Sequence, residues 1–141
     1  MNFYLHYQIG RVGFATLIDE IKEIARTKTI FTESNLPKNV TGFFELRKRR
    51  VCLFDLPNFL GIETSKNFEI IVTEINNGWV GFKVEKVYGV IASGEVLPYP
   101  LLIQKKDYLN GLLINGKEIL QILSLKKILS GVRFKAIQKY L

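Results

Sequence analysis

A chain of 141 residues, 48% hydrophobic and 23% charged, has the length and composition of one globular domain, which excludes a disordered chain. The net charge of +7 is spread over both halves: residues 1–61 carry nine basic and six acidic side chains (9 − 6 = +3), and residues 62–141 carry eleven and seven (11 − 7 = +4). A modest excess spread in this way favours an ordinary solvated surface.

Cysteine content and hydropathy narrow the class of protein further. Cys52 is the only cysteine, so a disulfide within the chain and a cysteine-based zinc site are both excluded. No segment approaches the ~18 uninterrupted apolar residues of a membrane span, and the N-terminus lacks the pattern of a signal peptide. We therefore expect a cytoplasmic protein.

Short strands are predicted along most of the chain, because β-branched, aromatic and alternating residues recur between turn signals. The predicted strands cover residues 3–9, 11–18, 50–56, 68–75, 79–87, 88–92, 111–115 and 118–125. Residues 18–25 allow a helix, since Ile18, Ile21 and Ala25 would share one face. We favour a strand with a short irregular break there, because the corresponding segment of the repeat described below is rich in valine.

Turns and short helices complete the predicted elements. Asn77-Gly78 and Asn115-Gly116 are hairpin signals, because the favoured two-residue turns need positive φ at both central residues. Asp55 can cap a single helical turn that ends at Gly61, and Ser124 can cap another. A terminal helix would place on one face the three residues Phe134, Ile137 and Leu141.

The chain contains an internal repeat. Three pairs of segments resemble each other: 42–44 and 111–113, 51–60 and 120–129, and 12–14 and 80–82. The first two pairs share one offset (111 − 42 = 69; 120 − 51 = 69), and the third has an offset of 80 − 12 = 68. We infer two similar lobes of about 70 residues, and many short strands that must close their edges predict small barrels.

The inventory of reactive side chains argues against an enzyme. His6 is the only histidine and falls in an alternating strand, where it is predicted to be a surface or packing residue. Asp19, Glu20 and Glu23 could approach a cation, but an ordinary solvated face is favoured. Neither a phosphate-binding glycine loop nor a serine nucleophile elbow is present. We expect no catalytic residue, metal, cofactor or small-molecule substrate.

Two clusters of basic residues leave an alternative function open, namely that of a β-barrel that binds single-stranded nucleic acid. The first is the run from Arg47 to Arg50, and the second is the tail from Lys126 onward, which has no acidic residue and could also touch an acidic membrane surface. Nucleic-acid binding would need exposed aromatic side chains beside these cations. Five aromatic residues stand in strongly apolar stretches, so we expect them in the core: Phe43, Phe44, Phe54, Phe59 and Phe82.

The stretch LPKNVTGFFELRKRRVCLFDLPNFLGI, residues 36–62, resembles the signature of the CheW-like chemotaxis coupling proteins. The positions that match, in order, are Pro37, Gly42, Leu46, Arg47, Asp55 and Leu56. Residues 14–24, 70–91 and 107–129 resemble the family's preceding segment, central hairpin and closing hairpin with its helix. One departure is that Lys48 stands where the family has its turn glycine, so a different turn geometry is expected.

This resemblance implies an all-β fold of two tandem, five-stranded SH3-like barrels, pseudo-duplicated and interleaved, with short helical turns. Residues 1–141 would form a single CheW-like domain. Its first lobe would cover about 10–77, and its second lobe about 78–141 together with the N-terminal strand 1–9.

The resemblance also implies a non-catalytic adaptor. It would couple the cytoplasmic tip of a methyl-accepting chemoreceptor to the regulatory domain of a CheA-type histidine kinase, and receptors would recruit it to the inner membrane face. The implied receptor-binding residues are Ile21, Glu23, Gly42 and Arg47. Each also has an ordinary structural explanation. Ile21 could be a core residue and Glu23 a solvated carboxylate, while Gly42 could serve a turn and Arg47 a hairpin ion pair. Kinase binding is implied for the second lobe, around Gly81 and Val90, with no individual contact assigned.

Overall fold

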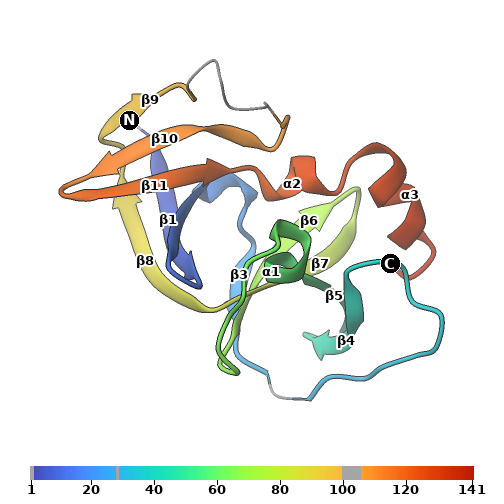
Figure 1. Ribbon diagram of the computed structural model, residues 1–141. Coiled ribbons are helices and arrows are strands. Elements are labelled where there is room, and N and C mark those ends of the chain that lie inside the picture. Colours follow the sequence, from blue (N-terminus) through green and yellow to red (C-terminus); the bar gives the residue numbers. More distant parts are fainter. Residues whose placement is uncertain (1, 28, 100–105) are drawn as a thin grey trace.

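The computed structural model describes residues 2–27, 29–99 and 106–141, and within them the protein is mostly β (Figure 1). The strands are Phe3–Ile9 (β1), Val12–Leu17 (β2), Glu23–Ala25 (β3), Val40–Leu46 (β4), Arg49–Asp55 (β5), Glu69–Ile75 (β6), Gly78–Val84 (β7), Lys86–Ala92 (β8), Glu95–Leu97 (β9), Leu109–Asn115 (β10) and Glu118–Leu123 (β11). The helical segments are the 3-10 turn Ile18–Glu20 (η1), Leu56–Leu60 (α1), Leu125–Ile128 (α2) and Gly131–Gln138 (α3). None of these helices is long and apolar enough to cross a membrane. The predicted all-β class with short helical turns is confirmed.

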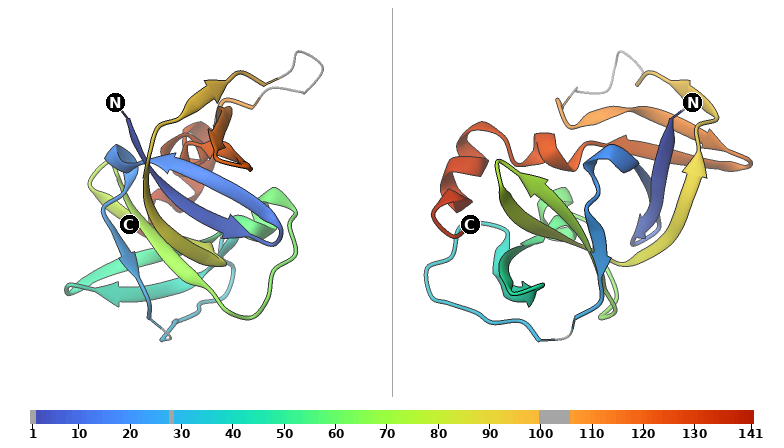
Figure 2. Two further views of the ribbon diagram at one scale, coloured as in Figure 1. Left: turned by 90° about the vertical axis from the view of Figure 1, so that its left-hand side faces the viewer. Right: turned by 180° about the vertical axis from the view of Figure 1, so that it is seen from behind.

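The described strands form two sheets that lie side by side as two lobes (Figure 1, Figure 2). The five-stranded sheet, in the order β3-β6-β7-β5-β4, is the first lobe, and the six-stranded sheet, in the order β8-β1-β2-β11-β10-β9, is the second. Each sheet contains one parallel contact, β5 with β7 and β11 with β2, while its other neighbours are antiparallel. The second lobe exceeds the expected five strands because the short strand β9 adds to its edge.

The residues that form each lobe differ from the expected ranges, which were about 10–77 for the first lobe and about 78–141 with 1–9 for the second. Strand β2 pairs with β1 and β11 in the second lobe, and β7 pairs with β5 and β6 in the first. The first lobe is therefore built from the continuous stretch 23–84, and the second lobe from strands on both sides of it. Local patterning leaves a distant partner such as β11 open, which explains the place of β2, whereas β7 follows β6 through a hairpin that the expected bound divided.

Three apolar clusters hold the lobes together. The interior of the first lobe contains Ala25, Phe44, Val51, Leu53, Ile70, Val72 and Trp79. The interior of the second contains Tyr4, Ala15, Leu113, Leu120 and Ile122. The largest cluster takes residues from both lobes, such as Tyr7 of β1 and Phe82 of β7, each fully buried. Because this shared cluster removes so much apolar surface from water, the two lobes form one folding unit.

The predicted repeat corresponds to two matching units, β4-β5-α1 and β10-β11-α2. In each, a glycine marks the place where the pairing register shifts, Gly42 in β4 and Gly111 in β10. A side chain then caps the following helix: Asp55 accepts a hydrogen bond from the backbone of α1, and Ser124 accepts one from the backbone of α2.

The C-terminal helix α3 packs on the first lobe, and the chain ends beside β4 (Figure 1). Ile137 is buried in the shared cluster, and the Tyr140 ring lies 5.6 Å from that of Phe43. Leu141 covers Gly78 so closely that a Cβ atom at Gly78 would lie 2.7 Å from Leu141 Cδ1. The predicted terminal helix is thus present and anchors the end of the chain to the five-stranded sheet.

A candidate partner-binding surface on the first lobe

A two-residue turn joins β4 to β5 and displays the basic run at its tip. Leu46 pairs with Arg49, which leaves Arg47 and Lys48 as the central residues, with φ of 51° and 63°. Positive φ at both positions matches the twist of the two strands, although residues with a Cβ rarely adopt it. The turn therefore carries two cationic side chains at its tip, those of Arg47 and Lys48.

Arg47 is bonded to Glu23 of β3. Its Nε donates a hydrogen bond to Glu23 Oε1 at 2.8 Å, and the Arg47 side chain remains 69% exposed while that of Glu23 is 24% exposed. This hydrogen bond, together with the negative charge of Glu23, raises the pKa of Arg47 above its ordinary value. Since β3 and β4 are the two edge strands of the first lobe, the pair links both edges of that sheet.

Ile21 continues this surface toward the second lobe. It is half-buried and lines an open, polar hollow of about 430 Å³ together with Glu74 and Lys126. The backbone N–H of Lys126, in α2, donates to Glu20 Oε1 at 3.0 Å, so this hollow lies where the second lobe meets the first. Ile21 and Glu23 are two residues apart in extended chain, which directs them to the same side. Ile21, Glu23 and Arg47 together are called the Arg47 surface below.

Gly42 does not belong to the Arg47 surface. It is buried beneath the segment that precedes β4, where a Cβ atom would lie 2.4 Å from the carbonyl oxygen of Phe31. Phe31 and Phe43 exchange two backbone hydrogen bonds of 2.7 Å, which hold that segment in place. The glycine therefore permits a close backbone approach inside the protein instead of one by a partner.

The remaining arginines of the basic run are held by contacts within the first lobe. The Arg49 guanidinium carbon lies 4.1 Å from the ring centroid of Trp79, and its Nη2 donates to the carbonyl oxygen of Asn77 at 2.7 Å. The Arg50 guanidinium stacks 3.7 Å above the Phe43 ring and pairs with Glu33. Nothing local in the sequence indicates the Trp79 contact, because residues 49 and 79 are brought together by the pairing of β5 with β7.

The residues expected near a kinase surface occupy different lobes. Gly81 lies in β7 of the first lobe, where a Cβ atom would be 2.6 Å from Ile70 Cγ2, so Gly81 is an interior packing position. Val90 lies in β8, at one edge of the second lobe, and is 59% exposed. Tyr88 in the same strand is 51% exposed. An exposed apolar edge strand is a ready surface for protein contact.

His6 packs between strands and lies apart from the Arg47 surface. It is 8% exposed, its ring centroid is 4.8 Å from that of Tyr88, and its Nε2 lies 3.8 Å from Glu118 Oε2. Over the described parts of the chain, no three His, Cys, Asp or Glu side chains gather closely enough to hold a metal ion. The Arg47 surface instead has the mixture of apolar and charged groups found at the rim of a protein interface.

Comparison with known proteins agrees with this architecture. The family model of the CheW-like domain matches residues 4–133 of the sequence, whereas no curated protein matches the chain in sequence. Among solved structures, the crystal structure of the scaffolding protein TtCheW from Thermoanaerobacter tengcongensis is similar, with a TM-score of 0.81 and 20% identity over 94% of each chain. That likeness shows a shared fold. Because the family model spans 130 of the 141 residues (133 − 4 + 1 = 130), the chain belongs to the CheW-like family of chemotaxis scaffold proteins.

Proposed function

We propose that this protein is a non-catalytic adaptor of the cytoplasm, which couples the cytoplasmic tip of a methyl-accepting chemoreceptor to the regulatory domain of a CheA-type histidine kinase. The observation that carries the proposal is the Arg47–Glu23 pair. It holds an exposed cation at the tip of a defined turn, on a domain of a family that serves as a scaffold.

The receptor binds the Arg47 surface. Ile21 supplies apolar area, while Glu23 orients the guanidinium of Arg47 and leaves its other N–H groups directed at solvent. Such an oriented guanidinium suits bidentate contact with a carboxylate of the receptor. Gly42 acts indirectly, by letting the segment around Phe31 pack against β4.

The kinase regulatory domain binds the second lobe along β8, where Val90 and Tyr88 are exposed. Strand β8 and the Arg47 surface belong to different lobes, so both partners bind at once. Binding in this arrangement raises the local concentration of kinase at the receptor, which requires no chemistry from the adaptor.

The test is the charge reversal Arg47→Glu, measured by isothermal titration against a receptor cytoplasmic fragment and, separately, against a kinase regulatory domain. We expect receptor affinity to fall about tenfold or more, equivalent to about 1.4 kcal/mol, with kinase affinity unchanged. Lys117→Glu is the matched control, because Lys117 occupies the corresponding turn of the second lobe. Equal receptor affinity in both variants would remove Arg47 from the site.

A double variant separates direct contact from support of the fold. Exchanging the two charges, Arg47→Glu with Glu23→Arg, restores an ion pair inside the first lobe but reverses the charges shown to the receptor. If Arg47 contacts the receptor, the exchange does not restore binding; full restoration assigns the arginine a purely structural role.

The alternative of single-strand nucleic-acid binding has less support. Arg49 and Arg50 are occupied by contacts to Trp79, Phe43 and Glu33, and the Phe43 ring is buried in the core. A labelled oligothymidine decides the matter: binding that weakens steeply with salt, together with no affinity for either signalling partner, would replace the adaptor proposal.

A further inference from the structure

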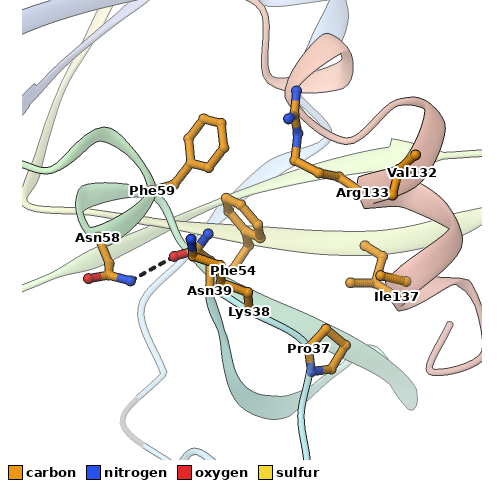
Figure 3. Close-up of a pocket in the computed structure, with 10 residues that line it drawn as sticks. Pro37, Lys38, Asn39, Phe54, Asn58, Phe59, Val132, Arg133 and Ile137 are labelled. Carbon is orange, nitrogen blue, oxygen red and sulfur yellow. Dashed lines mark hydrogen bonds between the residues drawn. The ribbon is translucent and has the colours of Figure 1, made fainter.

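A cleft of about 390 Å³ lies between α1, α3 and the segment Pro37–Asn39 that leads into β4 (Figure 3). Figure 3 shows the side chains of Phe54 and Ile137 facing this cleft from β5 and α3, with Phe59 of α1 and Arg133 of α3 farther along its border. Three segments that are distant in sequence therefore meet around one hollow.

The floor of the cleft is apolar and firmly packed. Phe54 is 2% exposed and Ile137 is 1% exposed, so both are fixed in the core and present only a small area to the hollow. The Phe54 ring contacts those of Phe59 and Phe82, with centroids 5.6 and 5.5 Å away. On the rim, Val132 is 84% exposed and Ala136 follows one helical turn later on the same face of α3.

The charged residues around the cleft are all cationic in the part of the chain that the structure describes. Lys38 and Arg133 line it, and no Asp or Glu does. Arg133 is held in place, because its Nε donates to the carbonyl oxygen of Ile128 at 2.6 Å and its guanidinium carbon lies 5.3 Å from the Phe59 ring centroid. Opposite, Asn58 Nδ2 donates to Asn39 Oδ1 at 2.6 Å and fixes the loop to α1.

This cleft is separate from the Arg47 surface. Strand β5 begins next to the Arg47 turn and ends at the cleft, so its seven residues place about 20 Å between the two. Part of the cleft wall, including Ala136 and Ile137, also lies beyond the residues 4–133 that match the family model. The C-terminal helix α3 therefore supplies one wall of the cleft, and residues within the matched range supply the rest.

We propose that the cleft binds a segment of a partner protein in which one large apolar side chain stands next to carboxylates. The apolar side chain fills the hollow above Phe54 and Ile137, and the carboxylates pair with Arg133 and Lys38. The volume suits this occupant, because it is near the lower end of the roughly 300–1,000 Å³ of ligand pockets and accepts a single aromatic or aliphatic side chain. A recessed apolar floor favours an inserted side chain over a bilayer, which is bound by protruding apolar residues.

The experiment uses three synthetic hexapeptides and two-dimensional NMR of the full-length, isotope-labelled protein. The probe peptide is acetyl-Glu-Glu-Ala-Phe-Glu-Glu-amide, which has one large apolar side chain; one control replaces all four acidic residues with lysine, and the other replaces the phenylalanine with alanine. At peptide concentrations up to about 1 mM, corresponding to about −4 kcal/mol of binding free energy, we expect shifts at Phe59, Val132 and Ala136 with the probe alone.

Variants localise the binding. We expect Ala136→Trp, which fills the cleft from an exposed position, and Arg133→Glu, which reverses its charge, to weaken probe binding at least tenfold. Lys38→Glu, on an exposed loop, tests the charge independently if Arg133→Glu fails to fold. Lys117→Glu in the second lobe is the matched control and should leave probe affinity unchanged.

Four outcomes would overturn the proposal. They are the absence of any shift with the probe, equal binding of the lysine peptide, shifts confined to the Arg47 surface, and an unchanged affinity in Ala136→Trp. Co-sedimentation with phosphatidylserine vesicles that is lost in Lys38→Glu, without probe shifts, would assign the cleft to a membrane surface instead.

Discussion

The β4–β5 and β10–β11 hairpins occupy corresponding places in the two lobes but differ at their turns. In the first lobe Arg47 and Lys48 both adopt positive φ, whereas the turn of the second lobe obtains its positive φ, 62°, from Gly116. Arg47 is bonded to Glu23, while Lys117 makes no side-chain hydrogen bond or ion pair with any described residue.

The contact role proposed for the first turn would account for this difference. Glycine relieves the strain of positive φ, which amounts to roughly 1 kcal/mol or more at a residue with a Cβ. The first lobe retains two long cationic side chains despite this strain. The β4–β5 turn, with two long side chains, offers more groups to a partner than the β10–β11 turn, where glycine has no side chain. This supports the proposed role of Arg47.

The largest effect is expected from the two Val-Gly-Phe segments, where alanine should harm the first lobe more than the second. At Gly81 a new Cβ meets Ile70 Cγ2 at 2.6 Å and the buried Phe44 ring at 2.9 Å. At Gly13 the close contact is with one atom only, Cδ2 at the end of the Leu120 side chain. We expect Gly81→Ala to lower the free energy of unfolding by about 2–3 kcal/mol and Gly13→Ala by less than about 1 kcal/mol. Urea denaturation measures both, and equal losses would contradict the comparison.

Alkaline pH should destabilise the whole protein through two groups of the shared cluster, Cys52 of β5 and Tyr7 of β1. Burial raises the pKa of Cys52 from 9.0 to about 12, and burial raises that of Tyr7 above its ordinary 10.0. Because a raised pKa favours the protonated group in the folded state, stability is complete below the unfolded pKa and is lost as the pH rises toward the folded value. Unfolding free energy should therefore fall above pH 9, by at most about 1.4 kcal/mol per pH unit for each group.

Two variants assign this alkaline loss to its groups. Urea midpoints measured between pH 8 and 10.5 should fall less steeply in Cys52→Ala across the whole range above pH 9. In Tyr7→Phe the slope should change only above pH 10, since the Tyr7 hydroxyl begins to ionise later. A slope unaffected by either substitution would show that other groups dominate the alkaline response.

The smallest effect concerns the turns themselves. Lys48→Gly should raise the free energy of unfolding by about 0.5–1 kcal/mol, because glycine adopts the φ of 63° without strain. Lys117→Gly should lower it by a few tenths of a kcal/mol, because glycine at that position adds chain entropy to the unfolded state and relieves no positive φ. Equal changes in urea-denaturation free energy would mean that the two turns are equally relaxed.

Much of the fold was predictable because its signals are local. The strand after the break at residues 18–25, the capping side chains Asp55 and Ser124, and the repeat at an offset of 69 are all present. The hairpin turns came close: Asn76 and Asn77, with φ of 48° and 70°, form the β6–β7 turn, one residue before the predicted pair.

The place of β2 and the cleft were not predictable from local pattern. The parallel pairing of β2 with β11 is not encoded by sequence alternation, whereas the hairpin signal after β6 already placed β7 beside β6 and the expected lobe bound at 77/78 did not use it. The cleft joins ordinary residues near positions 38, 58 and 133, none of which forms a motif by itself. The residues of the Arg47 surface were suggested by family resemblance, whereas the buried position of Gly42 required the structure.

Because the first lobe is one continuous stretch of chain, its strands and those of the second lobe can pair at different times during synthesis. Strands β3–β7 leave the tunnel together and can pair without waiting for later chain, whereas β1 and β2 must wait for β8 and β11. During that interval the N-terminal hairpin lacks the strands that pair with it in the folded protein. The second lobe therefore cannot close until β11 has been made, although its first two strands leave the ribosome before the whole of the first lobe.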